Sequence, residues 1–272
     1  MIYHRKIYII VHSLPYMHLL QSIIFSLITA TSLYAAEPKK TIILDPGHEP
    51  WNKQSSWYQS GEAQANLKFA KSLEATIMKE GKYEVITTLN EQGYNPLLVN
   101  FEKKQREKVT SIRQQYNDNK KLTLDTQHYY QMLHVRALFF QPEYKTQKAD
   151  IFVSIHHNVP GEEGSKMHYG FCIYYSDNGA CGEQSKDLAV AIKNALVKAG
   201  YQLSTNGGEK KGFFAKDFAV LHHATKAVPA VLMELGYITH HQDKEDAYDN
   251  EKVAQKAKVI YRVLDDFLSR RK

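Results

Sequence analysis

Three apolar runs of this 272-residue sequence end in a side chain that could bind a metal ion or transfer a proton. Imidazole nitrogens and carboxylate oxygens are ligands of zinc, and a carboxylate can also act as a general base. The carboxyl ends of parallel strands lie at one edge of a sheet, so side chains placed there can converge on one site. The three are His48 after residues 41–44, His156 at the end of residues 149–156 and Glu234 near the end of residues 228–235.

Glu62 is a fourth candidate, because it begins a helical pattern soon after His48. Two histidines, one carboxylate and an open position suit a catalytic zinc, which leaves a further carboxylate to act as the base. Ordinary explanations also exist: His48 could be a turn histidine, His156 could bond to the backbone, and Glu62 could favour the helix dipole. Glu234 is harder to explain in that way, since a carboxylate in an apolar strand is costly to bury without a partner or a purpose.

The segments that must position these side chains alternate between strand and helix patterns. Pro46 and Gly47 favour a tight exit from the first strand, and residues 49–61 and 204–212 are predicted loops. The alternation predicts one α/β domain with a largely parallel sheet. The predicted strands are residues 41–44, 83–89, 149–156, 170–175 and 228–235, and the predicted helices are residues 62–80, 101–115, 129–140, 183–199 and 251–268, with a break at 117–119.

The first 36 residues have the plan of a secretory signal peptide or an uncleaved N-terminal anchor. Arg5 and Lys6 precede an apolar stretch (residues 19–34) that is followed by two alanines. Either interpretation predicts export, to the periplasm or the cell envelope, and leaves residues 37–272 as the functional domain. No later segment is long and apolar enough to cross a membrane as a helix.

The net charge argues against a nucleic-acid partner, and the cysteine content excludes one kind of zinc site. The net charge of +6 falls to +4 without Arg5 and Lys6, which is too weak to indicate a nucleic-acid partner. The chain has only two cysteines, Cys172 and Cys181, so a zinc site of four thiolates is excluded. In an oxidising compartment this pair could form a local disulfide, or the two could remain thiols.

Four motifs, in their order along the chain, resemble the zinc-dependent N-acetylmuramoyl-L-alanine amidases of the amidase_3 type. The resemblance runs from about Lys40 to Leu268, and it includes Arg136 and short pieces at 211–221. It implies a single domain with a twisted, mainly parallel sheet of about six strands flanked by helices. The motifs are DPGH at 45–48, Glu62 followed by Asn66, SIHHN at 154–158 and PAVLMELGYIT at 229–239.

This resemblance also implies an activity. The substrate would be peptidoglycan, cleaved at the amide between the lactyl group of muramic acid and L-alanine, and a protein activator or regulator could take part. One zinc ion per chain would be held by His48, Glu62 and His156, with Glu234 as the catalytic acid. The residues that would contact the substrate or support the ligands are Asn66, Arg136, His157 and Asn158.

Several features depart from the family pattern. Glu49-Pro50 stand where two glycines are usual, so the rim of the site should differ most in the loop that follows. His157 replaces a usual alanine. Residues 90–127 form a connection that is much longer than the usual one. They could be a surface decoration, or they could form a lid or a partner-docking element. Residues 160–167 form only a short turn where some relatives carry a regulatory helix, so that form of autoinhibition is not expected.

Two other functions fit the same residues. One is a different cell-wall zinc peptidase, such as a carboxypeptidase, and the other is a non-hydrolysing wall-binding protein of the same fold. Four intact key positions argue against the second. The pairs His222-His223 and His240-His241 match no ligand position and are predicted to be structural or exposed.

Overall fold

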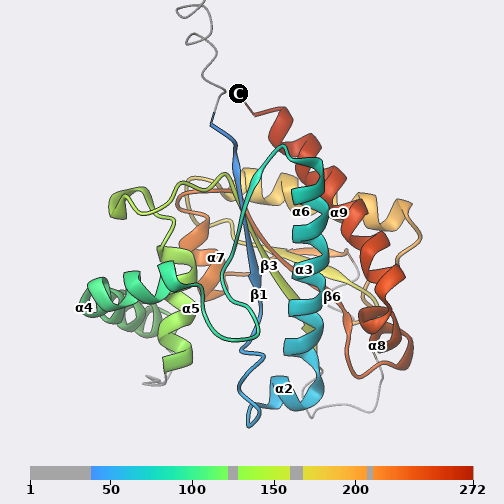
Figure 1. The fold of residues 1–272 in the computed structure, drawn as a ribbon, viewed down its shortest axis with the longest axis horizontal. Coiled ribbons are helices and arrows are strands. Elements are labelled where there is room, and N and C mark those ends of the chain that lie inside the picture. Colours follow the sequence, from blue (N-terminus) through green and yellow to red (C-terminus); the bar gives the residue numbers. More distant parts are fainter. Residues whose placement is uncertain (1–37, 122–127, 160–167, 207–210, 272) are drawn as a thin grey trace, which may run out of the picture. The chain divides into compact units, whose positions relative to one another are not determined.

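The computed structural model describes residues 38–271, except for 122–127, 160–167 and 207–210 (Figure 1). The predicted signal peptide or anchor and the predicted turn at 160–167 lie outside these residues. The chain divides into two units, Met1–Pro38 and Lys39–Lys272, and the helices and strands of the described residues all belong to the second. Within the described residues, no helix has both the length and the apolar character needed to cross a membrane.

A six-stranded sheet with the order β2-β1-β3-β6-β4-β5 forms the centre of this unit. Only the pairing of β4 with β6 is antiparallel, which confirms the predicted α/β class with a mainly parallel sheet. β1 and β3 are neighbouring interior strands and are buried along most of their length, as continuous apolar strands should be. The strands are β1 Thr41–Pro46, β2 Glu84–Thr87, β3 Ile151–Asn158, β4 Cys172–Tyr175, β5 Phe213–Ala215 and β6 Ala230–Tyr237.

One face of the sheet is covered by α3 (Glu62–Glu80), α6 (Gly182–Lys198) and α9 (Asn250–Ser269). In Figure 1 these three helices lie together on one side of the strands. The buried residues of α9 recur at three- and four-residue steps, as expected for an amphipathic helix whose apolar stripe faces the core. They are Val253, Ala257, Ile260, Tyr261, Leu264 and Leu268.

The other face is covered by α4 (Pro96–Asn119), α5 (His128–Leu138) and α7 (Ala219–Ala224). α4 begins five residues before the predicted helix, because Asn95 caps it through the backbone amide of Leu97 and Pro96 occupies the first turn. It also runs to Asn119, so the predicted break at 117–119 is wrong, and the irregular residue within α4 is Gln105.

α4 buries Leu98, Phe101 and Val109 in the apolar core beneath this face. The described part of the segment at 90–127 therefore contributes one buried face, that of α4, to this core.

Besides the 3₁₀ helix η1 (Pro142–Tyr144), four short helices and strands were not predicted. α2 (Ser56–Ser60) lies within the predicted loop at 49–61, and α8 (His241–Tyr248) follows β6. β5 and α7 are the other two. Cys172 is buried in β4 and Cys181 precedes α6, and the structure contains them as two thiols and not as a disulfide.

Candidate metal centre

The turn after β1 presents His48 at the edge of the sheet where β3 also ends. Pro46 pairs with Ile155 in register, so His48 and His156 leave neighbouring strands close together. A Cβ atom at Gly47 would clash with the imidazole of His156, so only glycine fits there. His48 has a φ angle of 65°, which is uncommon for a residue other than glycine and places its ring beside His156.

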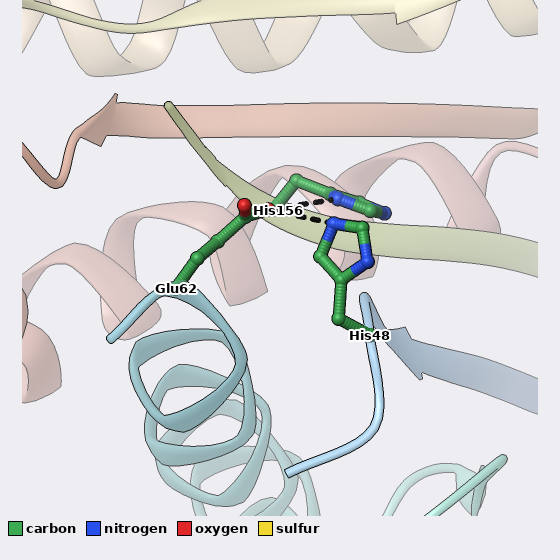
Figure 2. A group of neighbouring side chains, drawn as sticks. All are labelled: His48, Glu62 and His156. Carbon is green, nitrogen blue, oxygen red and sulfur yellow. Dashed lines mark hydrogen bonds and ion pairs between the residues drawn. The ribbon is translucent and has the colours of Figure 1, made fainter. Parts of the chain in front are cut away.

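Glu62, at the start of α3, points its carboxylate toward both imidazoles (Figure 2). Its Oε1 atom is 3.0 Å from His48 Nε2 and 3.2 Å from His156 Nδ1. The two rings are nearly perpendicular, with centroids 4.9 Å apart. One ligand atom of each residue lies within 4.8 Å of the other two, so all three can reach a single ion.

Burial and mutual hydrogen bonds set the charge states of these three side chains. Burial lowers the pKa of His48 to about 4, so its imidazole is neutral at pH 7 and can act as a ligand. Burial alone raises the pKa of Glu62, but hydrogen bonds to His156 and His48 outweigh it and lower the pKa to about 2. Burial opposes the charged form of His156, yet Glu62 and the nearby charge of Glu234 raise its pKa. Two imidazoles and an ionised carboxylate are a donor set that fits zinc.

Glu234 lies directly beside His156, because the two residues are register partners on β6 and β3. Both line a cavity of about 300 Å³ together with His48 and Glu62. The structure thus brings the three predicted ligands and the predicted catalytic acid to one cavity. His157 and Asn158 also line it, and most of the remaining lining is apolar, including Leu133 from α5 and residues 218–220 at the start of α7.

A family model described as N-acetylmuramoyl-L-alanine amidase, Amidase_3, matches residues 42–266. The chain belongs to this family. The probable cell wall amidase LytH of Staphylococcus saprophyticus is 28% identical over 209 residues, which are 76% of this chain and 50% of that protein. The chain therefore spans about half the length of this curated relative.

Solved structures of amidases share the fold. An N-acetylmuramoyl-L-alanine amidase from Clostridium difficile 630 has a TM-score of 0.56 at 20% identity. The CwlD amidase from Clostridioides difficile, in complex with the GerS lipoprotein, has a TM-score of 0.53 at 24% identity. The two matches cover 86% and 85% of this chain and 99% of each solved chain.

Asn66 and His157 form a chain of hydrogen bonds behind Glu62. Asn66 Nδ2 donates to Glu62 Oε1 at 3.4 Å and to the carbonyl oxygen of Gly47 at 3.1 Å. His157 Nδ1 donates to Asn66 Oδ1 at 2.8 Å, and burial lowers the pKa of His157 to about 3, which keeps it neutral. His157, which stands where the amidase motif usually has alanine, thus holds Asn66, and Asn66 in turn bonds to the proposed ligand Glu62. The amide nitrogen of Asn158, which also lines the cavity, is buried and bonds to no described residue.

Arg136 lies beneath the turn that carries His48. Its Nη1 atom donates to Asp45 Oδ1 at 3.0 Å and to the carbonyl oxygen of Pro46 at 3.1 Å, and both charged side chains are fully buried. Thr88 and Ser154 also donate to the Asp45 carboxylate, at 2.7 and 2.8 Å. The structure therefore places Arg136 where it holds the end of β1, away from the cavity surface.

Trp57 is a site residue that the sequence reasoning missed. Its ring stacks on His48 with centroids 4.2 Å apart and planes 10° apart, and it lines the cavity. It lies on α2, which is capped by Ser55 and Gly61, in the loop where the family motif departs from two glycines. The sequence signal was the presence of three aromatic residues, Trp51, Trp57 and Tyr58, between His48 and Glu62, but without periodicity nothing indicated which of them faces the site.

The remaining histidine pairs have structural roles or are exposed, as predicted. His223 is buried, and its Nε2 atom lies 2.8 Å from His134 Nδ1. His222 bonds to Asp217. His240 caps α8, and His241 is exposed.

Proposed function

We propose that this protein is a zinc-dependent N-acetylmuramoyl-L-alanine amidase of the bacterial cell envelope. The observation that carries the proposal is the convergence of His48, Glu62 and His156 with Glu234 in one cavity of an Amidase_3 domain. His48, Glu62 and His156 would hold one zinc ion. When bound, zinc would polarise the scissile carbonyl and lower the pKa of a coordinated water toward neutrality.

Glu234 would act as the proton carrier. From its position beside His156 it would take a proton from the attacking water and return it to the leaving amine of L-alanine. Proton uptake from the water would require a carboxylate that is not a metal ligand, and Glu234 lies outside the group of three candidate ligands. Trp57 would keep the His48 ring in place, while Asn66 and His157 would orient Glu62.

The location and partners are part of the proposal. Residues 1–36 would direct export, as a cleaved signal peptide or as an anchor, and residues 37–272 would form the catalytic domain. The likeness to a cell wall amidase and to an amidase solved with a lipoprotein supports a peptidoglycan substrate and a protein regulator.

The test is product analysis after incubation of the purified protein with peptidoglycan. The amidase produces intact stem peptides with a new amino-terminal L-alanine and glycan strands with free lactyl carboxyl groups. A carboxypeptidase releases D-alanine and leaves the stem attached to the glycan. Peptidoglycan that is bound but unchanged would identify a wall-binding protein, and either of these last results would contradict the proposal.

A further inference from the structure

The carboxylate of Asp217 is a hub of hydrogen bonds at the start of α7. Ser176 Oγ donates to its Oδ1 at 2.8 Å, and His222 Nδ1 lies 3.0 Å from its Oδ2. Lys120 Nζ lies 2.7 Å from the same Oδ2. Burial alone raises the pKa of Asp217, but its bonds to Lys120, Ser176 and His222 lower this pKa to about 2. The Asp217 carboxylate is therefore ionised at neutral pH.

The long segment at 90–127 supplies two of the contacts to Asp217. Lys120 directly follows α4, and Tyr116 of α4 donates from its hydroxyl to the Asp217 carbonyl oxygen at 2.8 Å. The Tyr116 ring also packs edge-on against His134 and His222, with centroids 5.4 and 5.2 Å away. The carboxyl end of α4 is thus fastened to both α5 and α7.

The residues that follow Asp217 form a wall of the metal cavity. Phe218, Ala219 and Val220 line it, and Leu133, next to His134, lines it from α5. The residues that α4 contacts, Asp217 and His134, are therefore the sequence neighbours of lining residues Phe218 and Leu133. Phe101 near the start of α4 and Val109 in its middle are packed in the core, so the helix can hold this wall in a defined position.

We infer that Tyr116 and Lys120 are positioning residues that set the apolar wall of the active site through Asp217. This inference rests on the proposed amidase function and assigns a role to the segment at 90–127. The wall is built from apolar side chains and carries no proposed metal ligand, so it contacts the bound substrate and not the metal. Loosening it weakens substrate binding while the metal and the proton carrier stay in place.

The experiment compares Tyr116→Phe, Lys120→Met and the double variant with wild-type protein on a soluble N-acetylmuramoyl-peptide. The matched control is the double variant Tyr144→Phe with Lys103→Met. The Tyr144 hydroxyl bonds to no described residue although its ring packs on Phe101 of α4, and Lys103 is exposed on the same helix. Each variant is assayed for kcat, KM, bound zinc and thermal midpoint.

The expected result is a KM raised about threefold to tenfold in the double variant, with kcat within about twofold and zinc content unchanged. The control keeps the wild-type KM. A lower thermal midpoint with unchanged KM would show a purely structural role and overturn the inference, and so would a loss of zinc or a fall in kcat alone. If Tyr116→Phe does not fold, Lys120→Met decides by the same criteria. Absence of hydrolysis by the wild-type protein would instead contradict the proposed function.

Discussion

At the residue scale, His156 and Glu234 are register partners with different proposed tasks. In the proposed function His156 would bind the metal, and Glu234 would move a proton. This division predicts that the two tasks can be separated by substitution. Glu234→Gln keeps the shape of the side chain but removes its basicity, so hydrolysis should fall by about 10²- to 10⁴-fold while bound zinc stays at the wild-type level.

The measurement is the rate of stem-peptide release together with metal analysis of the same preparation. Glu107→Gln is the control, because Glu107 is exposed on α4. Hydrolysis at the wild-type rate in Glu234→Gln would show that another group carries the proton.

His157 gives a second prediction at this scale. Removing its ring leaves Asn66 Oδ1 without its donor, so Asn66 no longer holds Glu62 in one orientation. His157→Ala should therefore weaken zinc binding by about 10- to 100-fold. Competition with a zinc-binding dye measures this, and His241→Ala serves as the control because His241 is exposed. Equal zinc affinity in the two variants would remove His157 from the supporting set.

The site was more predictable from the sequence than its surroundings. His48, His156 and Glu234 end or follow strong apolar runs. Because the carboxyl ends of parallel strands lie at one edge of a sheet, their side chains are expected at the same place. The sequence pattern did not reveal the role of Asp45, because its partners Arg136, Thr88 and Ser154 come from three separate segments.

At the element scale, the buried pair of Arg136 and Asp45 joins α5 to the end of β1. Removing the guanidinium would leave the Asp45 carboxylate charged and fully buried. Arg136→Met should therefore lower the free energy of unfolding by about 3 kcal/mol or more. Denaturant unfolding of the zinc-free protein measures the loss.

The double variant Asp45→Asn with Arg136→Met is the companion experiment. It removes both charges, so it should be more stable than Arg136→Met alone. A loss in Arg136→Met of less than about 1 kcal/mol, the range of an exposed ion pair, would contradict this account of the turn.

The elements that the sequence did not reveal are short. β5 has three residues and α7 has six, too few for a period of two or of 3.6 residues to stand out. α4 was found but placed too far along the chain, since charged residues dominate its middle and its true start depends on the Asn95 cap. Long apolar strands and amphipathic helices such as α9 were placed well because packing against the sheet enforces their pattern.

At the scale of the whole molecule, buried neutral histidines make stability depend on pH. Burial lowers the pKa of His134 to about 4 and that of His223 to about 2, from ordinary values near 6.5. Between these values and 6.5 the unfolded chain binds more protons at these two histidines than the folded chain does. Their contribution to the free energy of unfolding is therefore fully present above pH 6.5 and falls as the pH drops toward 4. Denaturant unfolding at several pH values between 7.5 and 4.5 should show this decrease.

The variant His223→Asn removes one titrating group, so its stability should vary less with pH over the same range, although it starts lower at pH 7.5. His241→Asn is the matched control and should keep the wild-type slope. An unchanged slope in His223→Asn would show that other groups cause the pH dependence.

The proposed function depends on one metal ion that would be held by side chains from the turn after β1, from α3 and from β3. The most direct test measures bound zinc and amide hydrolysis in one preparation before chelation, after chelation and after zinc is restored, with His48→Ala in parallel. We predict one zinc per chain, activity that disappears on chelation and returns with zinc, and neither zinc nor activity in His48→Ala. Full hydrolysis by the chelated protein, or a wild-type content of zinc in His48→Ala, would contradict the account.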